Sequence, residues 1–360
     1  MKYDFIIIGG GIAGISAAAR LSHHGRVLLL EMEASLAYHT SARSAALFEE
    51  SYGLPETVEL NRASRDDHMH KNGGVLSDRG VLLVARSDEK EAFLADSEKM
   101  YLQQITVAEA KAMVPVLDET VVSFASLHES AWDIDTDLLM QNELREMRQN
   151  GGEAKTKAPV TAIARTASGW DVTTPLGVFQ GSKIVNAAGA WVDHIAGLAG
   201  VDPIGIRPLR RSVARVPAPD GLDVSTWPML FGADESWYCK PDAGALIVSP
   251  AEEELMPPMD AWPEDMVLAE GIARFEAVTT IEVTRMLSSW AGLRSFAPDK
   301  RLVLGPDPAE PDFIWCAGQG GYGFQSSPAA SRLLCDLTIG NASEFSEKTV
   351  AAMRPDRLRK

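Results

Sequence analysis

The 360-residue sequence predicts an α/β (α+β) fold in which a Rossmann-like dinucleotide-binding domain is interleaved with a mostly antiparallel β-sheet domain. Three observations lead to this prediction. An apolar strand at the N-terminus runs directly into a Gly-x-Gly-x-x-Gly turn, a second glycine-rich turn follows a strand near the C-terminus, and a β-rich middle lies between them without any linker.

The first glycine turn has the pattern of a dinucleotide site. Gly9 permits a tight turn off the strand, Gly11 lets backbone N–H groups approach a pyrophosphate, and Gly14 lets the following helix pack closely on the sheet. The next apolar strand ends in Glu31, near the spacing expected of an acid that binds a ribose hydroxyl. A βαβ unit whose glycines serve packing alone is the alternative. The predicted binding residues here are Gly9, Gly11, Ile12, Ala13, Gly14 and Glu31.

Apolar periodicity and breaker residues predict the remaining elements of the first half of the chain. Residues 33–53 show no clear period and are interpreted as a functional loop. The predicted elements are a helix over 55–70, a hairpin over 74–86 that turns at Asp78-Arg79-Gly80, helices near 88–103 and 107–113, and a helix over 135–150.

The second half of the chain is predicted to be rich in strands. A basic tail, residues 354–360, is expected to fray. The predicted strands lie near 159–165, 169–174, 177–180, 183–189, 207–216, 236–249, 286–296, 301–305 and 313–317, and the helices over 263–278 and 325–338.

No single boundary along the chain divides the dinucleotide-binding elements from the β-rich ones, so each of the two predicted domains is discontinuous. The dinucleotide-binding domain is expected to comprise residues 1–73, 135–205 and 297–360. A substrate-binding domain is expected to comprise residues 74–134 and 206–296.

Composition narrows the function classes. A formal net charge of −16 argues against nucleic acid as a partner. Cys239, Cys316 and Cys335 share no close spacing, which fits a reducing compartment. No apolar run reaches membrane-span length, so we expect a cytoplasmic protein, or one that is peripheral at the inner membrane. His23-His24 and His68-Met69-His70 lack a third ligand and are interpreted as surface or helix-end histidines, so no metal site is predicted.

Three further segments have the composition of a cofactor site. The turn after the strand at 313–317 carries glycines that allow close approach of a flat ligand, ahead of a helix N-terminus that stabilises negative charge. Small residues follow the strand that ends at Asn186, and hydroxyls with one arginine occupy residues 39–46. A tight turn, helix–strand packing and a solvated loop are the respective alternatives. The predicted residues are Thr40, Arg43, Ser44, Ala45, Ala46, Val160, Ala188, Gly189, Trp191, Gly318, Gly320, Gly321, Tyr322 and Gly323.

The combination and order of several stretches resemble the FAD-dependent D-amino-acid oxidase superfamily, which includes glycine and sarcosine oxidases. Within it, the stretches are most similar to bacterial D-arginine dehydrogenases. They span nearly the whole chain, from about residue 3 to 340. The stretches are residues 38–46, 133–137, 185–191, 210–212, 227–230, 234–238, 240–244, 290–296 and 319–323.

The resemblance implies a noncovalently bound FAD and an amino acid that lies over the flavin. By that likeness, Arg294 and Arg211 clamp the substrate carboxylate, which the planar guanidinium fork suits. Tyr238 and Tyr52 add hydroxyl contacts, Tyr52 from a mobile lid, and the backbone of Gly321 meets the substrate amine. Structural ion pairs and cross-strand packing are the alternatives for the arginines and for Tyr238.

Two positions depart from the family pattern. Leu47 stands where the arginine dehydrogenases carry a histidine, and Val81 stands where they carry the acid that pairs with a cationic side chain. Without that acid, a desolvated guanidinium has no charge partner, so we expect a neutral or apolar substrate side chain. Glu49 and Glu50 either restore some preference for basic side chains or form a solvated acidic loop tip.

The predicted function is therefore FAD-dependent oxidative deamination of a D-amino acid, by hydride transfer from the α-carbon to flavin N5, to the imino acid and then the 2-oxo acid. Oxidation of a secondary amine, a glycine-like substrate or a 2-hydroxy acid is the first alternative. A nucleotide-binding protein without redox activity, or an NAD-dependent enzyme, is the second. The electron acceptor, whether a quinone, another carrier or O2, stays open.

Overall fold

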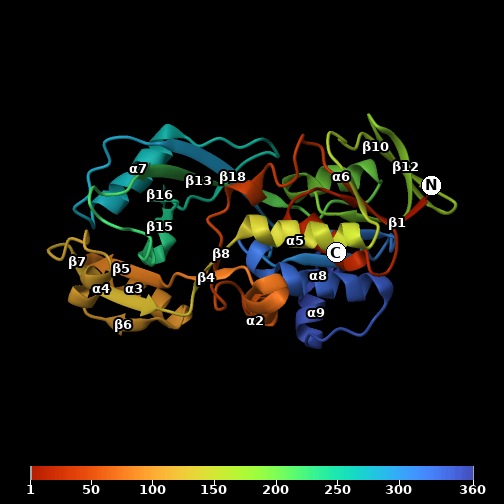
Figure 1. The fold of residues 1–360 in the computed structure, drawn as a ribbon. Coiled ribbons are helices and arrows are strands. Elements are labelled where there is room, and N and C mark those ends of the chain that lie inside the picture. The colour runs from red at the N-terminus through yellow and green to blue at the C-terminus, as the bar shows by residue number, and fades with distance from the viewer. Residues whose placement is uncertain (1, 360) are drawn as a thin grey trace.

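Two large sheets form the centres of the two lobes seen in Figure 1. The computed structural model describes residues 2–359, so the first and last positions of the predicted dinucleotide-binding segments lie outside the described residues. The helices are α1 (Ile12–Leu21), α2 (Pro55–His70), α3 (Lys90–Lys99), α4 (Val107–Met113), α5 (Thr136–Gln149), α6 (Val192–Leu198), α7 (Asp265–Glu276), α8 (Gly323–Ile339) and α9 (Glu347–Met353).

An eight-stranded sheet contains the N-terminal strand. Five of its strands, β20, β12, β1, β2 and β9, are parallel neighbours, and β10, β11 and β19 add antiparallel edges. The strands predicted at 177–180 and 183–189 are one continuous strand. The sheet comprises β10 (Ala162–Thr166), β11 (Gly169–Thr174), β12 (Gly177–Asn186), β1 (Lys2–Ile8), β2 (Val27–Leu30), β9 (Glu153–Lys155), β19 (Val303–Pro306) and β20 (Phe313–Ala317).

Both faces of this sheet are buried, which explains why its parallel strands are continuous apolar runs. Ile7, Leu29 and Val185 belong to the core shared with α1, α5 and α8. Their neighbours Ile6 and Leu28 point to the opposite face, into the core shared with α6. The carboxyl ends of the parallel strands are thereby held at one edge, where ligands bind in sheets of this kind.

A nine-stranded, mostly antiparallel sheet forms the other lobe. On one face, Leu82, Leu230 and Val248 pack with residues of α4 and α7. On the opposite face, Val81, Met229, Phe231 and Tyr238 line the cavity described below. The strand order is β17 (Glu254–Leu255), β13 (Arg207–Pro217), β16 (Ala245–Ser249), β15 (Tyr238–Asp242), β14 (Met229–Gly232), β5 (Val81–Arg86), β7 (Val122–His128) and β6 (Gln103–Ile105), with β18 (Ser288–Phe296) beside β13.

The predicted hairpin over 74–86 is wrong. Strand β4 (Leu76–Asp78) pairs with β8 (Trp132–Ile134), which also pairs with β3 (Leu47–Phe48), whereas β5 pairs with β14 and β7. The cause lies at the supposed turn, where the N–H groups of Arg79 and Gly80 both donate to the carbonyl of Ala131, at 3.1 and 2.9 Å. The chain therefore passes from a small connecting sheet into the large one instead of reversing.

The expectation of a frayed basic tail is also wrong for its described residues. Pro355–Leu358 form a short 3-10 helix. Arg357 donates to Asp299 at 2.8 Å, and Arg359 forms an ion pair with the buried carboxylate of Asp307. These ion pairs fix the tail to the eight-stranded lobe.

The two sheets are built from the segments that the sequence analysis assigned to the two domains. Every strand of the eight-stranded sheet lies within residues 1–73, 135–205 or 297–360, and every strand of the nine-stranded sheet lies within 74–134 or 206–296. The separate roles of the two parts in binding cofactor and substrate stay a prediction. Across residues 2–359, none of the helices has the length and apolar character needed to cross a bilayer.

Candidate active site

A cavity of about 530 Å³ runs from the carboxyl ends of the parallel strands to the inner face of the nine-stranded sheet. Its size is that of a site for a small molecule or cofactor. Ile8, Leu30 and Ala317 line it at the ends of β1, β2 and β20. Tyr238 and Phe231 line it from the opposite sheet. One cavity therefore joins the two lobes.

The first glycine turn forms one wall of this cavity. Gly9 has φ +112°, and a Cβ placed there would stand 2.3 Å from the carbonyl oxygen of Ala187, so a side chain is excluded on both grounds. Helix α1 begins directly after Gly11, whose position has no capping side chain. The positive end of α1 thus faces the cavity, where a phosphate would be stabilised.

Glu31 lies at the end of β2 with its carboxylate held by backbone. Its Oε2 accepts from Gly10 N at 2.7 Å and its Oε1 from Glu33 N at 2.8 Å. The side chain lines the cavity beside the glycine turn. This is the position from which a carboxylate binds the ribose of a dinucleotide.

The second glycine turn closes the opposite wall. Gly318 and Gly320 have φ of +70° and +51°, and a Cβ at Gly320 would stand 2.3 Å from the ring of Phe296. A Cβ at Gly321 would stand 3.2 Å from the guanidinium carbon of Arg294. Helix α8 begins two residues later without a capping side chain, so a second helix N-terminus is directed at the same cavity.

The loop at residues 39–46 lines the cavity, but two of its polar side chains bind protein groups, which its sequence did not indicate. Thr40 Oγ1 donates to the carbonyl of Leu293 at 2.9 Å. The guanidinium of Arg43 donates to the carbonyls of Ala261 and Ala291 and to Asp260, at 2.9, 2.8 and 2.5 Å. Arg43 lines the cavity, but its charged group binds protein, and it therefore holds this loop against β18.

Arg211 and Arg294 project from adjacent strands onto the same sheet face. Arg211 is paired with Gly292 and Arg294 with Leu209, so the two arginines are diagonal neighbours. Arg211 is buried, its Nε has no hydrogen-bond partner, and its nearest carboxylate oxygen, on Glu253, is 3.5 Å away. Burial, and then the charge of Arg294, lower the pKa of Arg211. Two guanidinium groups that line one cavity, one of them with an unpaired Nε, favour an anion between them.

Two tyrosines stand beside these arginines. Tyr238 is buried on β15, paired with Phe231 on one side and with Ser249 on the other. Tyr52 donates from its hydroxyl to Glu235 Oε2 at 3.1 Å, and burial raises the pKa of its phenol. Both tyrosines and Glu235 line the cavity.

Glu235 was not anticipated from the sequence. It lies in a short turn with Asp234, where both residues adopt positive φ, +49° and +58°. That turn brings its carboxylate into the cavity although Glu235 precedes the strand β15. A glutamate in a polar run such as Asp234-Glu235-Ser236 has no local pattern that distinguishes it from a solvated residue.

The remaining wall, beneath the arginines and tyrosines, is apolar. Val81, Met229 and Phe231 lie on the cavity face of β5 and β14, and Leu47 and Met100 line the same region. Val81 stands at the position where the arginine dehydrogenases carry an acid, so this part of the wall has no carboxylate. This wall therefore suits an uncharged group.

The two acids of the lid segment are not a solvated loop tip. Glu49 is buried, its Oε2 lies 2.7 Å from His128 Nδ1, its Oε1 accepts from Ser51 N, and burial raises the pKa of its carboxyl group. Glu50 pairs with Arg65 at 3.0 Å. Neither carboxylate is free to replace the missing acid.

The structure brings most of the predicted site residues to this cavity, with two exceptions. Gly14 does not line it. A Cβ there would stand 1.9 Å from the carbonyl oxygen of Gly9, so this glycine serves the packing of α1. Tyr322 does not line it either, since its ring packs between Tyr52 and Phe296. The cofactor contacts of the others stay predictions.

The histidines do not form a metal centre. Within residues 2–359, no group of three or more His, Cys, Asp or Glu side chains is arranged to hold a metal ion. His23, His24 and His70 are exposed, as expected. His68 is buried rather than at the surface, but it lies in the last turn of α2, which agrees with the helix-end alternative, and its Nε2 lies 3.0 Å from the carbonyl oxygen of Gln325.

Known proteins similar to this chain include one named as FAD-dependent, an oxidase and a dehydrogenase. FAD-dependent oxidoreductase domain-containing protein 1 of Bos taurus is 25% identical over 94% of this chain and 81% of its own length. N-methyl-L-tryptophan oxidase of Salmonella typhimurium is 22% identical over 96% of this chain and 97% of its own. Human mitochondrial dimethylglycine dehydrogenase is 24% identical over 96% of this chain, which spans only 43% of that longer protein.

The fold is that of known solved structures. Glycine oxidase from Geobacillus kaustophilus superposes with a TM-score of 0.81 at 20% identity, over 98% of this chain and 99% of that one. L-alpha-glycerophosphate oxidase from Mycoplasma pneumoniae, solved with FAD bound, gives 0.83 at 20% identity, over 96% and 97%. The family model "DAO: FAD dependent oxidoreductase" matches residues 4–337. With two glycine turns and two helix N-termini directed at one cavity, the chain belongs to the DAO family of FAD-dependent oxidoreductases and uses FAD.

Proposed function

We propose that this enzyme oxidises a D-amino acid with an uncharged side chain to its imino acid, which water then hydrolyses to a 2-oxo acid and ammonia. The observation that carries the proposal is the pair of guanidinium groups, Arg211 and Arg294, that line one cavity together with the second glycine turn. The D configuration is supported by the resemblance of the site stretches to bacterial D-arginine dehydrogenases.

The cavity residues fit FAD. The cradle at Gly9–Gly14, with the N-terminus of α1 and the carboxylate of Glu31, suits the pyrophosphate and a ribose. The N-terminus of α8 suits the end of the flavin that gains negative charge on reduction. When bound, FAD supplies the acceptor for the two electrons that leave the substrate.

The two arginines would hold the substrate carboxylate. A planar guanidinium can donate two parallel N–H bonds to a carboxylate, and two of them fix the plane of the acid as well as its position. Tyr238 lies beside them with a hydroxyl that can donate to the same group, and the hydroxyl of Tyr52 could do so after turning away from Glu235. Fixing the carboxylate places the α-carbon, because the two are one bond apart, and this proximity supplies much of the acceleration.

The substrate amine would lie near the backbone of Gly321, which is close to Arg294. The α-hydrogen leaves with both electrons of its C–H bond, as a hydride. The nitrogen of a neutral amine forms the C=N bond with its lone pair. The neighbouring cations disfavour an ammonium group, so binding itself favours loss of the amine proton. No protein base is then required at the α-carbon.

The side chain of the substrate would lie against Val81, Met229 and Phe231. Burying a charge there without a partner would be costly, whereas an apolar side chain gains about 25 cal/mol for each Å² that it buries. We therefore favour substrates with aliphatic or thioether side chains over D-arginine.

Oxidation of a secondary amine or a glycine-like substrate is the second candidate. The similar proteins named for N-methyl-L-tryptophan, dimethylglycine and glycine favour it. Such substrates also carry a carboxylate, so the arginine pair does not distinguish the two. The two candidate substrate classes differ in the group that would lie against the apolar wall and in whether the nitrogen carries a second carbon substituent.

Anaerobic stopped-flow reduction of the bound flavin tests the proposal. The panel comprises D- and L-methionine, D-norvaline, D-arginine, sarcosine, glycine and lactate. We expect D-methionine and D-norvaline to reduce the flavin with the highest kred/Kd. Faster reduction by sarcosine or glycine would establish the second candidate, and a purified protein without a flavin spectrum would overturn both. Mixing the reduced enzyme with air or with an artificial quinone then identifies the class of electron acceptor.

A further inference from the structure

Helix α8 is interrupted by a proline three residues after it passes the cavity. Pro328 has no N–H to offer the carbonyl of Phe324, and Ser327 Oγ donates to that carbonyl instead, at 3.0 Å. Such an interruption inside a buried helix needs partners from elsewhere in the fold.

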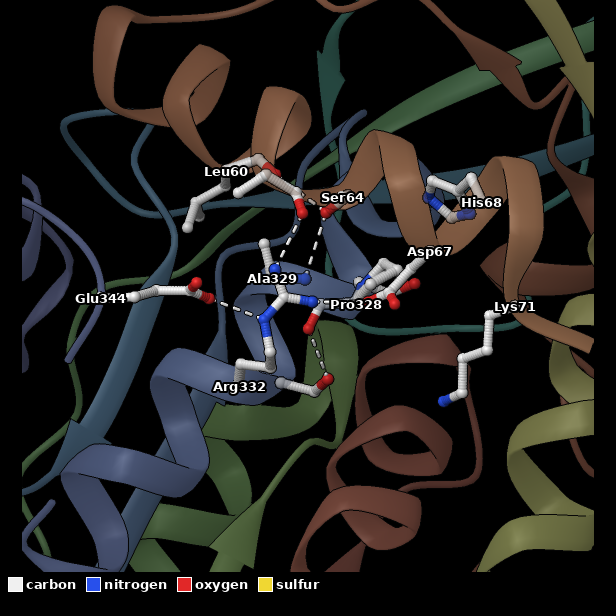
Figure 2. Close-up of polar contacts among 12 residues, drawn as sticks. Leu60, Ser64, Asp67, His68, Lys71, Pro328, Ala329, Arg332 and Glu344 are labelled. Carbon is white, nitrogen blue, oxygen red and sulfur yellow. Dashed lines mark hydrogen bonds and ion pairs between the residues drawn. The ribbon is translucent and has the colours of Figure 1, made fainter. Parts of the chain in front are cut away.

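Helix α2 supplies these partners. Figure 2 shows Ser64, Asp67 and His68 of α2 facing the turn of α8 that contains Pro328. Ser64 Oγ accepts from Ala329 N at 3.1 Å, and Arg332 forms an ion pair with Asp67 at 2.5 Å (Figure 2). The carbonyl of Gln325 lies 3.0 Å from His68 Nε2.

The imidazole of His68 must be the donor in this bond, because a carbonyl oxygen only accepts. Its other nitrogen, Nδ1, is buried without a partner, which fits a neutral ring whose Nδ1 carries only a lone pair. Burial lowers the pKa of His68 to about 4, so the ring is neutral at physiological pH. The tautomer with hydrogen on Nε2 is thus set by the carbonyl of Gln325.

Gln325 joins this interface to the cavity. Its side-chain Nε2 donates to the carbonyl of Tyr52 and its Oε1 accepts from Glu49 N, each at 3.3 Å. The residue is buried and lines the cavity. One residue is therefore held through its backbone by His68 and holds the segment 49–52 through its side chain.

We propose that His68, which does not line the cavity, is a positioning residue: it fixes Gln325 so that the side-chain amide of Gln325 holds segment 49–52, and with it the hydroxyl of Tyr52, beside the substrate. The inference rests on the proposed function only for the choice of assay substrate. Asn61, two turns before His68 on the same face of α2, donates to the carbonyls of Glu50 and Tyr52 at 3.3 and 3.0 Å, so this face of α2 supports the segment at both ends.

The test compares three variants of the FAD-loaded enzyme with the wild type. His68→Gln places an amide N–H where Nε2–H stood and should behave as the wild type does. His68→Leu keeps the volume but removes the donor, and should raise KM about tenfold with less effect on the limiting rate of flavin reduction, the loss expected of one buried hydrogen bond. Ser64→Ala disturbs the same proline turn without touching Gln325, and should lower Tm but leave KM unchanged.

Hydrogen–deuterium exchange gives a readout that does not depend on turnover. Peptides covering residues 49–53 should exchange faster in His68→Leu than in the wild type, and at the wild-type rate in His68→Gln and Ser64→Ala. If His68→Leu does not fold, His68→Asn replaces it, because its shorter amide reaches the position of Nδ1 and not that of Nε2.

Three outcomes would overturn the inference. They are an equal rise of KM in Ser64→Ala, a His68→Gln variant as impaired as His68→Leu, and unchanged exchange of residues 49–53 in the variant that lacks the donor. If none of the panel substrates reduces the wild-type flavin, the proposed function fails, and the exchange experiment still decides the role of His68.

Discussion

Arg211 and Arg294 leave the same face of two adjacent antiparallel strands, two positions out of register, with Gly292 directly opposite Arg211. A Cβ at Gly292 would stand 3.6 Å from Thr40 and Arg43, so the loop at residues 39–46 lies against this position, and the strand register sets both guanidinium groups on one cavity. Because neither group is fully paired by protein carboxylates, the site carries local positive charge inside a protein whose formal net charge is −16. An anionic substrate is therefore compatible with the acidic composition.

Replacing Arg294 tests this arrangement most directly. Arg294→Ala should raise KM for the amino acid about 100-fold or more, because it removes one partner of a buried charge pair. Arg294→Lys should recover only part of this loss, since an ammonium group cannot donate in parallel to both carboxylate oxygens. Steady-state kinetics with an artificial acceptor measures both effects.

The matched control for that substitution is Arg215→Ala. Arg215 lies on the same strand as Arg211 but binds Asp242 at 2.8 Å, outside the cavity. Its loss should leave KM unchanged. A comparable rise of KM in both variants would show that loss of any arginine from the paired strands β13 and β18 has this effect, and would remove the arginine pair from the site.

The bond between Tyr52 and Glu235 predicts a contribution of the tyrosine hydroxyl to substrate binding. Tyr52→Phe removes that hydroxyl from the cavity and should raise KM about three- to tenfold, as expected for one ordinary hydrogen bond. Tyr3→Phe is the control, because Tyr3 also donates to a glutamate, Glu153, at 3.1 Å, but neither residue lines the cavity. Equal KM values for Tyr52→Phe and the wild type would contradict the assignment.

Val81 predicts the preference for an uncharged side chain. Val81→Glu should raise kcat/KM for D-arginine relative to D-norvaline by about tenfold or more, because it supplies the missing partner of a desolvated guanidinium. The same variant should be less stable without substrate, since Val81 is 1% exposed and the new carboxylate would be buried. Val81→Gln, equal in size but uncharged, should not show the change in preference.

The sequence predicted those features that depend on local pattern. Gly9 and Gly320 are turns in which positive φ and close neighbours both require glycine, and such turns are visible in the sequence. Continuous apolar strands with helices between them identified the parallel sheet. The order of stretches around Arg211 and Arg294 identified the family, which the match over residues 4–337 confirms.

The sequence could not predict contacts set by how distant elements meet. Glu235 enters the cavity through an unusual turn, and Arg43 meets carbonyls of a segment more than two hundred residues away. The hairpin failed because Ala131 offers its carbonyl to both N–H groups of the supposed turn. The burial of His68 could not be predicted, because it depends on the contact between the last turn of α2 and the distant helix α8.

The burial of His68 also predicts how stability responds to acid. The pKa of this histidine is lowered from 6.5 in the unfolded chain to about 4 in the native state. As pH falls from about 6.5 towards 4, the unfolded state gains a proton that the native state does not, so the free energy of unfolding decreases, by about 3 kcal/mol at most. His68→Gln cannot take up that proton in either state. Its stability should therefore fall less than that of the wild type between pH 7.5 and pH 5.

Urea unfolding of the FAD-loaded proteins at the two pH values measures this difference. Groups other than His68 titrate in both proteins, so their contributions cancel when the pH-induced losses are subtracted. His70→Gln is the control on the same helix, because the side chain of His70 is 72% exposed, and this variant should lose as much stability as the wild type. An equal loss of stability in wild type and His68→Gln on acidification would contradict this prediction, because His68 would then take up its proton as readily in the native state as in the unfolded chain.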